Sequence, residues 1–362
     1  MSGFWNSSYG LGWSKYNGSS QGIPENKPSW VRCYCETGAG LDPIISYSDE
    51  LYFLSGGEVH HPILSIDLFS GNLNWKFEQP PVHDTFSGMC ASNDFILVSD
   101  RLLSAKGEEI ESFFELLKQE DIQSHIPFLL GENFVLRAIN RDIDPNKYFL
   151  YDLVTKKHQI IYLPVIFGEL SIGSDLVYGF IQKDEVNYLA CCSLKGDIVW
   201  EVEAPFGILT LNKEIVNFTP ENISIFSKEN GQLLKRMTSM ENQFSEDDID
   251  SFYKSHSLDT LNMLSGGDLS IFSIIEDKLL VKIEGAEIHD YCVSGDLIFT
   301  RQGRWDLVAY DRYSGQELWR CGERYAWQSL IASNNKLIIY CATGDIVCFD
   351  CGEPYISPNR PD

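Results

Sequence analysis

The chain has 362 residues, of which 44% are hydrophobic, so it is long enough to bury a large core. It carries 52 acidic and 28 basic side chains, and its formal net charge is −24. A surface this acidic repels nucleic-acid phosphates and anionic lipid headgroups, and it attracts basic molecules. The composition therefore argues against nucleic-acid binding and membrane-surface binding, and it favours a basic partner.

Residues 1–28 show no basic start followed by an apolar run, which is the pattern of a secretory signal. No later segment reaches the roughly 18 consecutive apolar residues that a membrane helix needs. We therefore expect a cytoplasmic protein in which residues 1–28 form an N-terminal tail. In a reducing compartment its ten cysteines stay as free thiols or bind metal.

A repeated phrase runs along most of the chain. It consists of an apolar strand after a polar turn, a second strand ending in Asp or Ser, a glycine turn, and a third strand that often carries Trp. Its first strand recurs about every 40 residues, with anchors at Leu51, Phe95, Phe134, Leu176, Ile215, Leu297 and Leu337. This period in short strands is typical of a β-propeller, in which each sheet buries its apolar faces against its neighbours.

In chain order, the strand SWVRCYCE at 29–36 comes first and has no sheet of its own. Copies of the repeat follow at 48–77, 92–110, 132–163, 174–202, 212–236, 294–320 and 334–354, with a degenerate copy expected at 268–285. The last copy ends before its Trp strand, so we predict that 29–36 pairs beside 345–351 as the outer strand and closes the propeller. Eight four-stranded blades result, with seven as the alternative. The propeller then spans 29–354, and residues 355–362 form a C-terminal tail.

Two insertions interrupt the repeats. Residues 107–125 have apolar side chains at a helical spacing, namely Ile110, Phe113, Phe114, Leu116 and Leu117. Residues 240–262 are acidic and are also compatible with a helix. The expected fold is therefore all-β, a single propeller with short helical insertions.

The glycine of each hairpin turn supplies the positive φ that a tight turn requires. A tryptophan follows this turn in three copies, at Trp75, Trp200 and Trp319. We expect these indoles to fill the gaps between adjacent sheets as core packing.

The segments IDLFSGNLNW at 66–75 and YDRYSGQELW at 310–319 resemble the pyrroloquinoline-quinone-type propeller repeat. That family contains quinone-dependent dehydrogenases and also non-catalytic scaffolds such as the outer-membrane assembly lipoprotein, so the resemblance implies the fold and leaves the function open. Its dehydrogenases use a vicinal cysteine pair in a glycine-rich loop beside the cofactor. Here the pair Cys191 and Cys192 lies inside a blade strand, and no acidic base with calcium ligands matches the family pattern. We therefore expect a non-catalytic member without a cofactor.

Metal binding has two candidate sets. Cys348 and Cys351 have the spacing of zinc ligands, and Cys33 and Cys35 are expected on the neighbouring strand. Residues three apart on a strand point to opposite faces, so this pair needs the turn at Gly352 to converge. Free core thiols are the favoured interpretation, and structural zinc is the alternative. A weaker metal candidate consists of the loop residues His60, His61, His83 and Asp84.

Propeller loops between the second and third strands, and those between blades, share one face and often carry function. On this face we expect partner-binding residues of the arginine-and-aromatic kind found in interface hot spots, namely Arg304, Trp305, Arg324, Tyr325 and Trp327. The alternative for the two tryptophans is packing beneath the loops. A second candidate surface is the acidic insertion, with Glu246, Asp247, Asp248 and Asp250.

The function that these features favour is binding of a basic protein by a monomeric, non-catalytic propeller. An inhibitor or immunity protein that neutralises a basic toxin or enzyme fits this description, because charge complementarity speeds encounter. A general assembly scaffold is the alternative. A quinone-dependent dehydrogenase-like enzyme or a small-ligand binder is less favoured.

Overall fold

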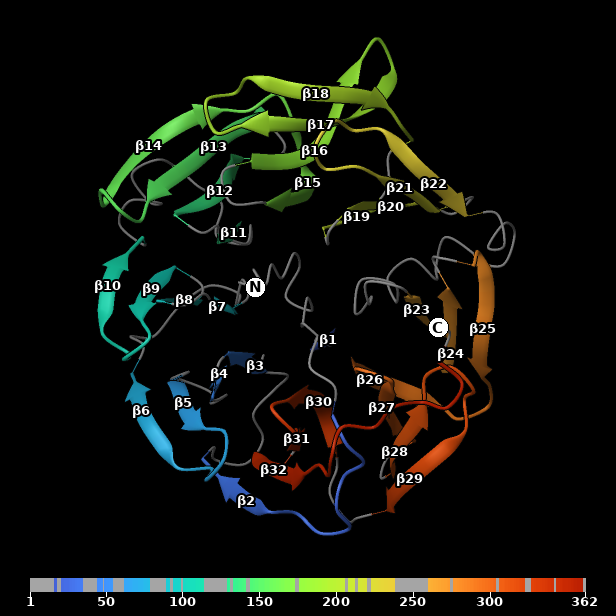
Figure 1. Cartoon of the computed structure of the whole chain (residues 1–362). Helices are drawn as coiled ribbons and strands as arrows, with labels where there is room; N and C mark the ends of the chain where they lie inside the picture. Colours follow the sequence, from blue (N-terminus) through green and yellow to red (C-terminus); the bar gives the residue numbers. More distant parts are fainter. Residues whose placement is uncertain are drawn as a thin grey trace. The chain divides into compact units, whose positions relative to one another are not determined.

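The computed structural model describes residues 16–17, 21–34, 44–47, 49–54, 62–78, 89–91, 94–98, 100–113, 129–130, 133–140, 144–172, 176–205, 208–211, 214–219, 223–237, 260–273, 276–303, 306–322, 327–341 and 343–360. These residues form strands and turns and contain no helix, and thus none that could cross a membrane. The chain, whose strands are labelled in Figure 1, divides into two compact units. Unit 1 comprises Met1–Gly12 and Asp84–Ile249, and unit 2 comprises Trp13–His83 and Asp250–Asp362.

Four antiparallel sheets make up the described part of unit 1. In spatial order, the first has β10 (Glu109–Ser112), β9 (Arg101–Ser104), β8 (Phe95–Val98) and β7 (Met89–Ala91), and the second has β11 (Leu129–Leu130), β12 (Phe134–Asn140), β13 (Asp144–Asp152) and β14 (Lys157–Tyr162). The third has β15 (Ile166–Ile172), β16 (Leu176–Lys183), β17 (Val186–Ser193) and β18 (Ile198–Glu203), and the fourth has β19 (Ile208–Leu211), β20 (Ile215–Phe218), β21 (Ile223–Phe226) and β22 (Leu233–Met237).

The described part of unit 2 also contains four sheets. The first has β3 (Ile44–Tyr47), β4 (Glu50–Leu54), β5 (Ile63–Asp67) and β6 (Leu73–Phe77), and the second has β23 (Thr260–Ser265), β24 (Asp268–Ser273) and β25 (Lys278–Ile283). The third has β26 (Ile288–Ser294), β27 (Leu297–Gln302), β28 (Asp306–Asp311) and β29 (Glu317–Gly322), with β1 (Tyr16–Asn17) added parallel to β26. The fourth has β2 (Trp30–Cys33), β32 (Asp345–Asp350), β31 (Lys336–Cys341) and β30 (Trp327–Ser333).

The predicted pairing of the N-terminal strand with the last repeat is confirmed. Strand β2 runs antiparallel to β32, with Trp30 opposite Cys348 and Cys33 opposite Asp345. The preceding residues continue this contact, since the amide of Glu25 donates to the carbonyl of Asp350 at 2.8 Å. The outer position that the last repeat leaves empty is thus filled by a strand from the start of the chain. The number of blades and the closure of the propeller stay predictions.

The repeated phrase Asp-x-x-Ser or Asp-x-x-Thr has a local structural cause. The carboxylate of Asp67 accepts hydrogen bonds from the amide and the hydroxyl of Ser70, at 2.7 and 2.6 Å. Asp311 binds Ser314 in the same way, at 2.7 and 2.9 Å. These bonds fix the turn before the outer strand and satisfy backbone donors that the sheet leaves unpaired. The repeated residues thus form the hydrogen bonds of the turn within each copy, without contacts from another copy.

A tryptophan on an outer strand packs against a turn glycine of the next sheet. Trp30 is 7% exposed, lies over Gly71, and donates its indole N–H to the carbonyl of Leu68 at 3.2 Å. Trp200 lies over Gly231 in the same way and donates to Lys228 at 3.0 Å. Both glycines have a φ of +70°, so their turns need glycine for backbone geometry as well as for space. The packing between sheets that was expected of Trp200 is thus confirmed, and Trp30 has the same role.

Trp319 has the same role with a different contact. It is buried and packs edge-on against Phe349 of the neighbouring sheet, with ring centroids 5.7 Å apart. Trp75 is only partly buried and lies 5.9 Å from the ring of Tyr52 within its own sheet.

The helix predicted from residue 107 onward is wrong for the part that the structure describes. Gly107 forms a tight turn with a φ of +79°, and residues 109–112 return as β10 alongside β9. Ile110 and Phe113 pack against the core next to β12 and β13, where Phe113 is fully buried. Pairing and burial thus override the local helical spacing. Residues 114–125 lie outside the described residues, as does the acidic insertion up to residue 259, after which 260–262 belong to β23.

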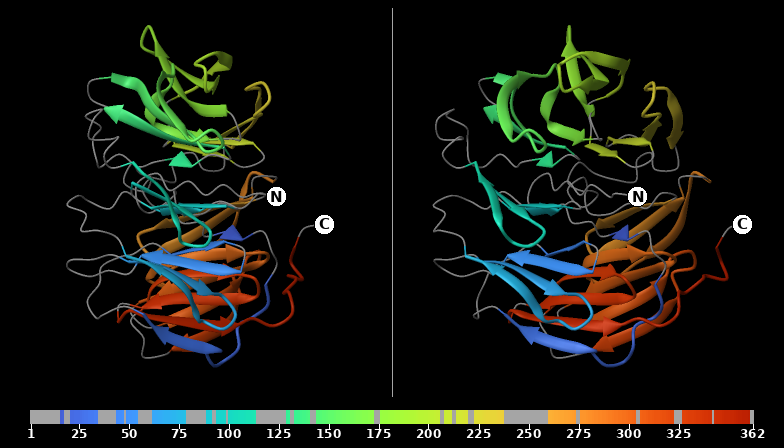
Figure 2. Two further views of the ribbon diagram at one scale, coloured as in Figure 1. Left: turned by 90° about the vertical axis from the view of Figure 1, so that its left-hand side faces the viewer. Right: turned by 60° about the vertical axis from the view of Figure 1, so that its left-hand side comes forward.

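The C-terminal tail forms no strand, yet it is anchored to the sheet of β26 to β29. The hydroxyl of Tyr355 donates to Asp311 at 2.7 Å, and the amide of Ser357 donates to the buried Asp296 at 3.0 Å. Arg360 approaches the same aspartate at 3.5 Å. In Figure 2 this segment, in red, runs along the strand ends of unit 2. We call residues 355–360 the C-terminal strap.

Candidate functional site

Eight of the nine predicted partner-binding residues lie outside the described residues. They are Arg304, Trp305, Arg324, Tyr325, Glu246, Asp247, Asp248 and Asp250. Trp327 begins β30, where its backbone pairs with Cys341, and the structure describes the backbone of this residue only. The weaker metal candidates His60, His61, His83 and Asp84 are also outside it, as is Cys35. The site is therefore built from the described residues that flank the predicted loops.

The loop that contains Arg304 and Trp305 joins β27 to β28 at one end of their sheet. At this end the amide of Gly303 donates to the carbonyl of Glu287, which belongs to the connection between β25 and β26, at 3.0 Å. The turn between β23 and β24 reaches the same place, since the amide of Ile288 donates to Gly267 at 2.9 Å. Within unit 2, a connection between sheets and a loop between second and third strands thus share one end, as predicted.

A cleft of about 550 Å³ opens to solvent at this end, between the connection from β25 to β26 and the sheet of β26 to β29. Its size lies within the range of about 300–1,000 Å³ that ligand pockets occupy. The cleft is lined by Glu284, Gly285, Ala286, Glu287, Gln302, Gly303, Asp306, Tyr310 and Arg320. Two of these residues, Gly303 and Asp306, directly flank Arg304 and Trp305 in the chain. We call this the loop-end cleft.

The one guanidinium among the described residues that line the cleft is already neutralised. Arg320 contacts Asp306 and Glu317, each at 2.6 Å. The hydrogen bond with Glu317 raises the pKa of Arg320 further above its usual value, and the same bond lowers the pKa of Glu317. Arg320 therefore stays charged but offers little net positive charge to a ligand.

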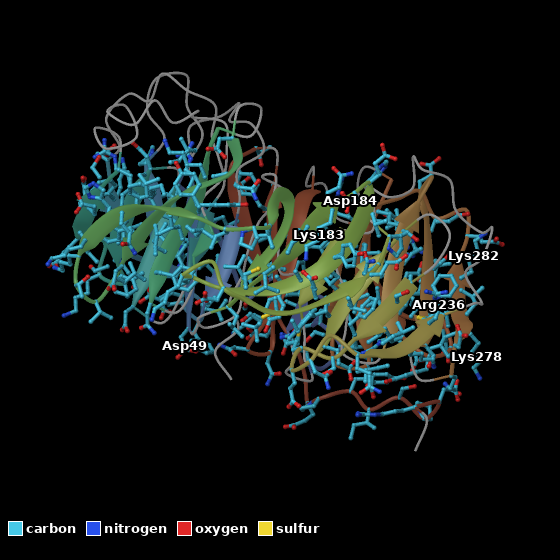
Figure 3. All side chains as sticks on the ribbon, turned by 90° about the horizontal axis from the view of Figure 1, so that it is seen from above. Asp49, Lys183, Asp184, Arg236, Lys278 and Lys282 are labelled. Carbon is cyan, nitrogen blue, oxygen red and sulfur yellow. The ribbon has the colours of Figure 1, made fainter. Side chains whose placement is uncertain are left out.

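The remaining lining carboxylates give the cleft an acidic excess. Glu284 pairs with Lys282 of β25 at 2.7 Å, and Lys278 of the same strand pairs with Glu276 instead. Figure 3 labels these two lysines. Glu287 pairs with none of the basic side chains in the described part of the chain. Among the described side chains at the cleft, two cations thus face four carboxylates: Arg320 and Lys282 against Glu284, Glu287, Asp306 and Glu317. This excess favours a positively charged ligand.

The floor of the cleft is polar and fixed. Gln302 and Tyr310 are each 6% exposed, and the amide nitrogen of Gln302 donates to the hydroxyl of Tyr310 at 2.6 Å and to Thr300 at 3.0 Å. The side-chain carbonyl of Gln302 accepts from the guanidinium of Arg320 at 3.5 Å, and this contact orients the side-chain amide. The floor is therefore positioned by its own hydrogen bonds.

The vicinal cysteines are placed differently from a catalytic pair. Cys191 and Cys192 are fully buried neighbours on β17 whose side chains enter different core clusters. Burial raises the pKa of Cys191 to about 11 and that of Cys192 to about 12. Both thiols are thus protonated near neutral pH, whereas nucleophilic or redox chemistry needs the thiolate.

The candidate zinc cysteines separate in the same manner. Cys348 packs in the cluster of Trp30 and Ile346, while Cys351 packs partly buried in the adjacent cluster. Cys33 is exposed and lies opposite Asp345, three residues before Cys348. In the described part of the chain, no three Cys, His, Asp or Glu side chains form a group that fits a metal ion.

The lining residues Glu287, Gln302, Tyr310 and Arg320 were not predicted as site residues. Gln302 and Arg320 lie inside strands of the repeat, where the pattern indicates only sheet structure. Glu287 has a φ of +47°, which is uncommon for a residue with a long side chain. The acidic connection EGAE at 284–287 between two copies was the available signal.

No protein-family model and no curated protein sequence matches the chain. Solved structures do match along most of it. BamB from Moraxella catarrhalis is 13% identical with a TM-score of 0.58, covering 91% of this chain and 99% of that one. A europium-containing methanol dehydrogenase is 11% identical with a TM-score of 0.57, covering 93% and 96%. The computationally designed Ika8 protein is 12% identical with a TM-score of 0.56, covering 88% and 99%.

At these identities the similarity shows the fold alone. The chain has a β-propeller fold like that of these structures, as the repeated phrase predicts. One of the similar structures is a dehydrogenase, so the fold does not distinguish an enzyme from a binding protein.

Proposed function

We propose that this chain is a non-catalytic, cytoplasmic propeller that binds a basic protein through the loop end of the unit 2 sheets. The observation that carries the proposal is the loop-end cleft, where the described carboxylates outnumber the described cations directly beside the loop of Arg304 and Trp305. The net charge of −24 supports the sign of the partner. Arginine and aromatic side chains in the flanking loops supply the anchor residues that interfaces use.

The buried thiols support the non-catalytic part of the proposal. The vicinal pair that suggested quinone chemistry is held as neutral thiols inside a strand, so it offers no thiolate to a cofactor. An absorbance spectrum of the purified protein with a stoichiometric bound chromophore would overturn this part.

An inhibitor or immunity protein is the specific form that we favour. An acidic protein that must neutralise a basic toxin gains from long-range attraction, which raises the association rate and weakens with salt. A general assembly scaffold is the second form, and the identity of the partner distinguishes the two.

The test begins with purification of the tagged chain from its native host and identification of the proteins bound to it. With the partner in hand, dissociation is measured by surface plasmon resonance for Trp305→Ala and Trp327→Ala. Loss of about 2 kcal/mol at a central anchor shortens the lifetime of the complex roughly 30-fold. Unchanged lifetimes in folded variants would show that another surface binds, with the acidic insertion of Glu246 and Asp247 as the next candidate.

A further inference from the structure

The loop-end cleft combines two requirements that a ligand must satisfy together. Glu287 provides a carboxylate that no described basic residue neutralises. On the floor, the oxygen of Tyr310 accepts from Gln302, and no acceptor among the described residues takes the hydroxyl hydrogen of Tyr310. A ligand that fills the cleft and excludes water from this hydroxyl must supply an acceptor in its place. The ligand therefore needs a positive charge at Glu287 and a hydrogen-bond acceptor at Tyr310.

A metal ion does not meet these requirements. The described residues around the cleft include no group of three metal-ligating side chains, and a metal ion has no acceptor to offer to a phenol. A neutral ligand leaves Glu287 uncompensated. An organic cation that also carries a carbonyl satisfies both groups.

Arginine within a polypeptide is such a ligand. Its guanidinium has five N–H donors, and its main chain carries the carbonyl that Tyr310 needs. A guanidinium is also more weakly hydrated than an ammonium and pairs with a carboxylate through two parallel bonds. The pairing of Arg320 with Glu317 already shows this geometry at the edge of the cleft, with contacts at 2.9 and 2.6 Å.

We propose that the loop-end cleft is a recognition site for an arginine residue, presented on the surface of the basic protein partner. This inference rests on the proposed function, and it adds the chemical group that the partner inserts. Glu287 binds the guanidinium, and Tyr310 donates to a main-chain carbonyl of the same residue. Gln302 and Arg320 position the floor and do not contact the ligand in this assignment.

The site is tested first without the partner, by titrating Nα-acetyl-arginine methylamide into the full-length isotope-labelled chain. Amide signals of Gly285 and Gly303 are followed by nuclear magnetic resonance. The expected result is saturable shifts of both signals at millimolar concentration. The citrulline analogue, which is nearly the same shape but uncharged, should leave them in place. Equal shifts with citrulline, or none with arginine, would overturn the proposal.

Variants then locate the interaction. Glu287→Gln should weaken binding of the arginine derivative about 10-fold, because a charged hydrogen-bonded pair is lost. Tyr310→Phe should weaken it by a smaller factor of about fivefold, the value of one neutral hydrogen bond. Glu353→Gln removes an exposed carboxylate far along the chain and serves as the matched control. Equal effects of Glu287→Gln and Glu353→Gln would mean that only the overall charge matters, against the proposal.

Partner binding to Glu287→Gln distinguishes failure of the arginine assignment from failure of the proposed function. If the recovered partner binds Glu287→Gln as tightly as the unchanged chain, the arginine assignment fails while binding of a basic protein stands. If no basic partner is recovered, the proposed function fails, and the titration alone decides whether the cleft binds guanidinium groups. Loss of partner affinity by about 10-fold or more in Glu287→Gln supports both.

Discussion

Replacement of Gly71 by alanine tests whether the contact between sheets depends on the turn glycine. An ideal Cβ at this position would lie 2.6 Å from Cδ2 and 2.7 Å from Cε3 of Trp30. These atoms belong to a ring that is 7% exposed and held by a hydrogen bond to Leu68. The indole therefore cannot move aside without leaving its partner or its pocket.

Two effects contribute to the expected loss of stability. The φ of +70° at Gly71 disfavours a side chain by about 1–2 kcal/mol. The forced displacement of a packed ring adds about 1–3 kcal/mol. The lower entropy of alanine in the unfolded chain returns about 0.4–1 kcal/mol. The expected net decrease in the free energy of unfolding is thus about 1–4.5 kcal/mol.

Gly266→Ala provides the matched control. Gly266 also has a positive φ, of +57°, but its ideal Cβ has no atom within 4 Å. Its cost should be only the backbone part, about 1 kcal/mol. In a Trp30→Leu background, which removes most of the ring above Gly71, the extra cost of Gly71→Ala should largely disappear.

The measurement is urea unfolding followed by circular dichroism, together with amide hydrogen exchange of β2 and β32. Gly71→Ala should speed exchange in these strands, because it loosens the sheet that carries Trp30. If Gly71→Ala and Gly266→Ala cost the same, or if the Trp30→Leu background changes nothing, the reasoning about this contact is wrong.

Three further predictions follow from the described contacts. Removing residues 1–20 should lower the melting temperature less than removing 1–28, because the second deletion also breaks hydrogen bonds to the segment after β32; equal shifts in calorimetry would contradict this. The side-chain hydrogen bond from Ser70 lowers the pKa of Asp67. The ionised Asp67 therefore stabilises the folded chain above pH 3.8, the pKa of the carboxyl in the unfolded chain. This stabilisation is lost as the pH falls through the lower pKa of the folded chain. Urea midpoints measured from pH 5 to 2 should therefore fall less steeply for Asp67→Asn than for the unchanged chain, and parallel curves would refute the assignment. At pH 8 the buried thiol of Cys191 should react with a disulfide reagent far more slowly than the exposed Cys33, as followed by mass spectrometry; similar rates would show that the strand opens readily.

The fold was predictable because its strongest signals are local. Hydrogen bonds among Asp311, Ser314 and Gly315 close one turn within five residues. The sequence of each copy is therefore enough to indicate its turn. The pairing of 29–36 with the last repeat was also accessible, since a missing strand and an unassigned strand complement each other. The helical spacing after residue 107 gave a wrong prediction, because Phe113 is buried and Ile110 partly buried by contacts with a different repeat. Such long-range contacts are absent from any local pattern.

The cleft was harder to predict than the fold. The loop of Arg304 and Trp305 was identified by composition, and the cleft does lie at that end of the sheet. Glu287, Gln302 and Tyr310 come from a connection and from two strands of one sheet, and they meet only once the strands of that sheet pair. The periodicity of the sequence predicts that Gln302 and Tyr310 lie on strands, but it does not show which strand residues line a cleft. Charge patterning could have drawn attention to Glu287, but it could not show that none of the described basic side chains pairs with it.

The opposite ends of one sheet explain how a loop-end site can be held rigid. Strand β27 begins beside Asp296, which the C-terminal strap binds through Ser357, and it ends at Gln302 on the floor of the cleft. Strand β28 runs back to Asp311, where burial raises the carboxyl pKa but hydrogen bonds from Ser357, Tyr355 and Ser314 lower it by more. The strap thus fixes one end of the strands whose other end carries the cleft. Because a recognition site binds more tightly when its groups are positioned before the ligand arrives, a firmly held sheet favours binding at its free end. The strap therefore supports the cleft from the far side of the same sheet.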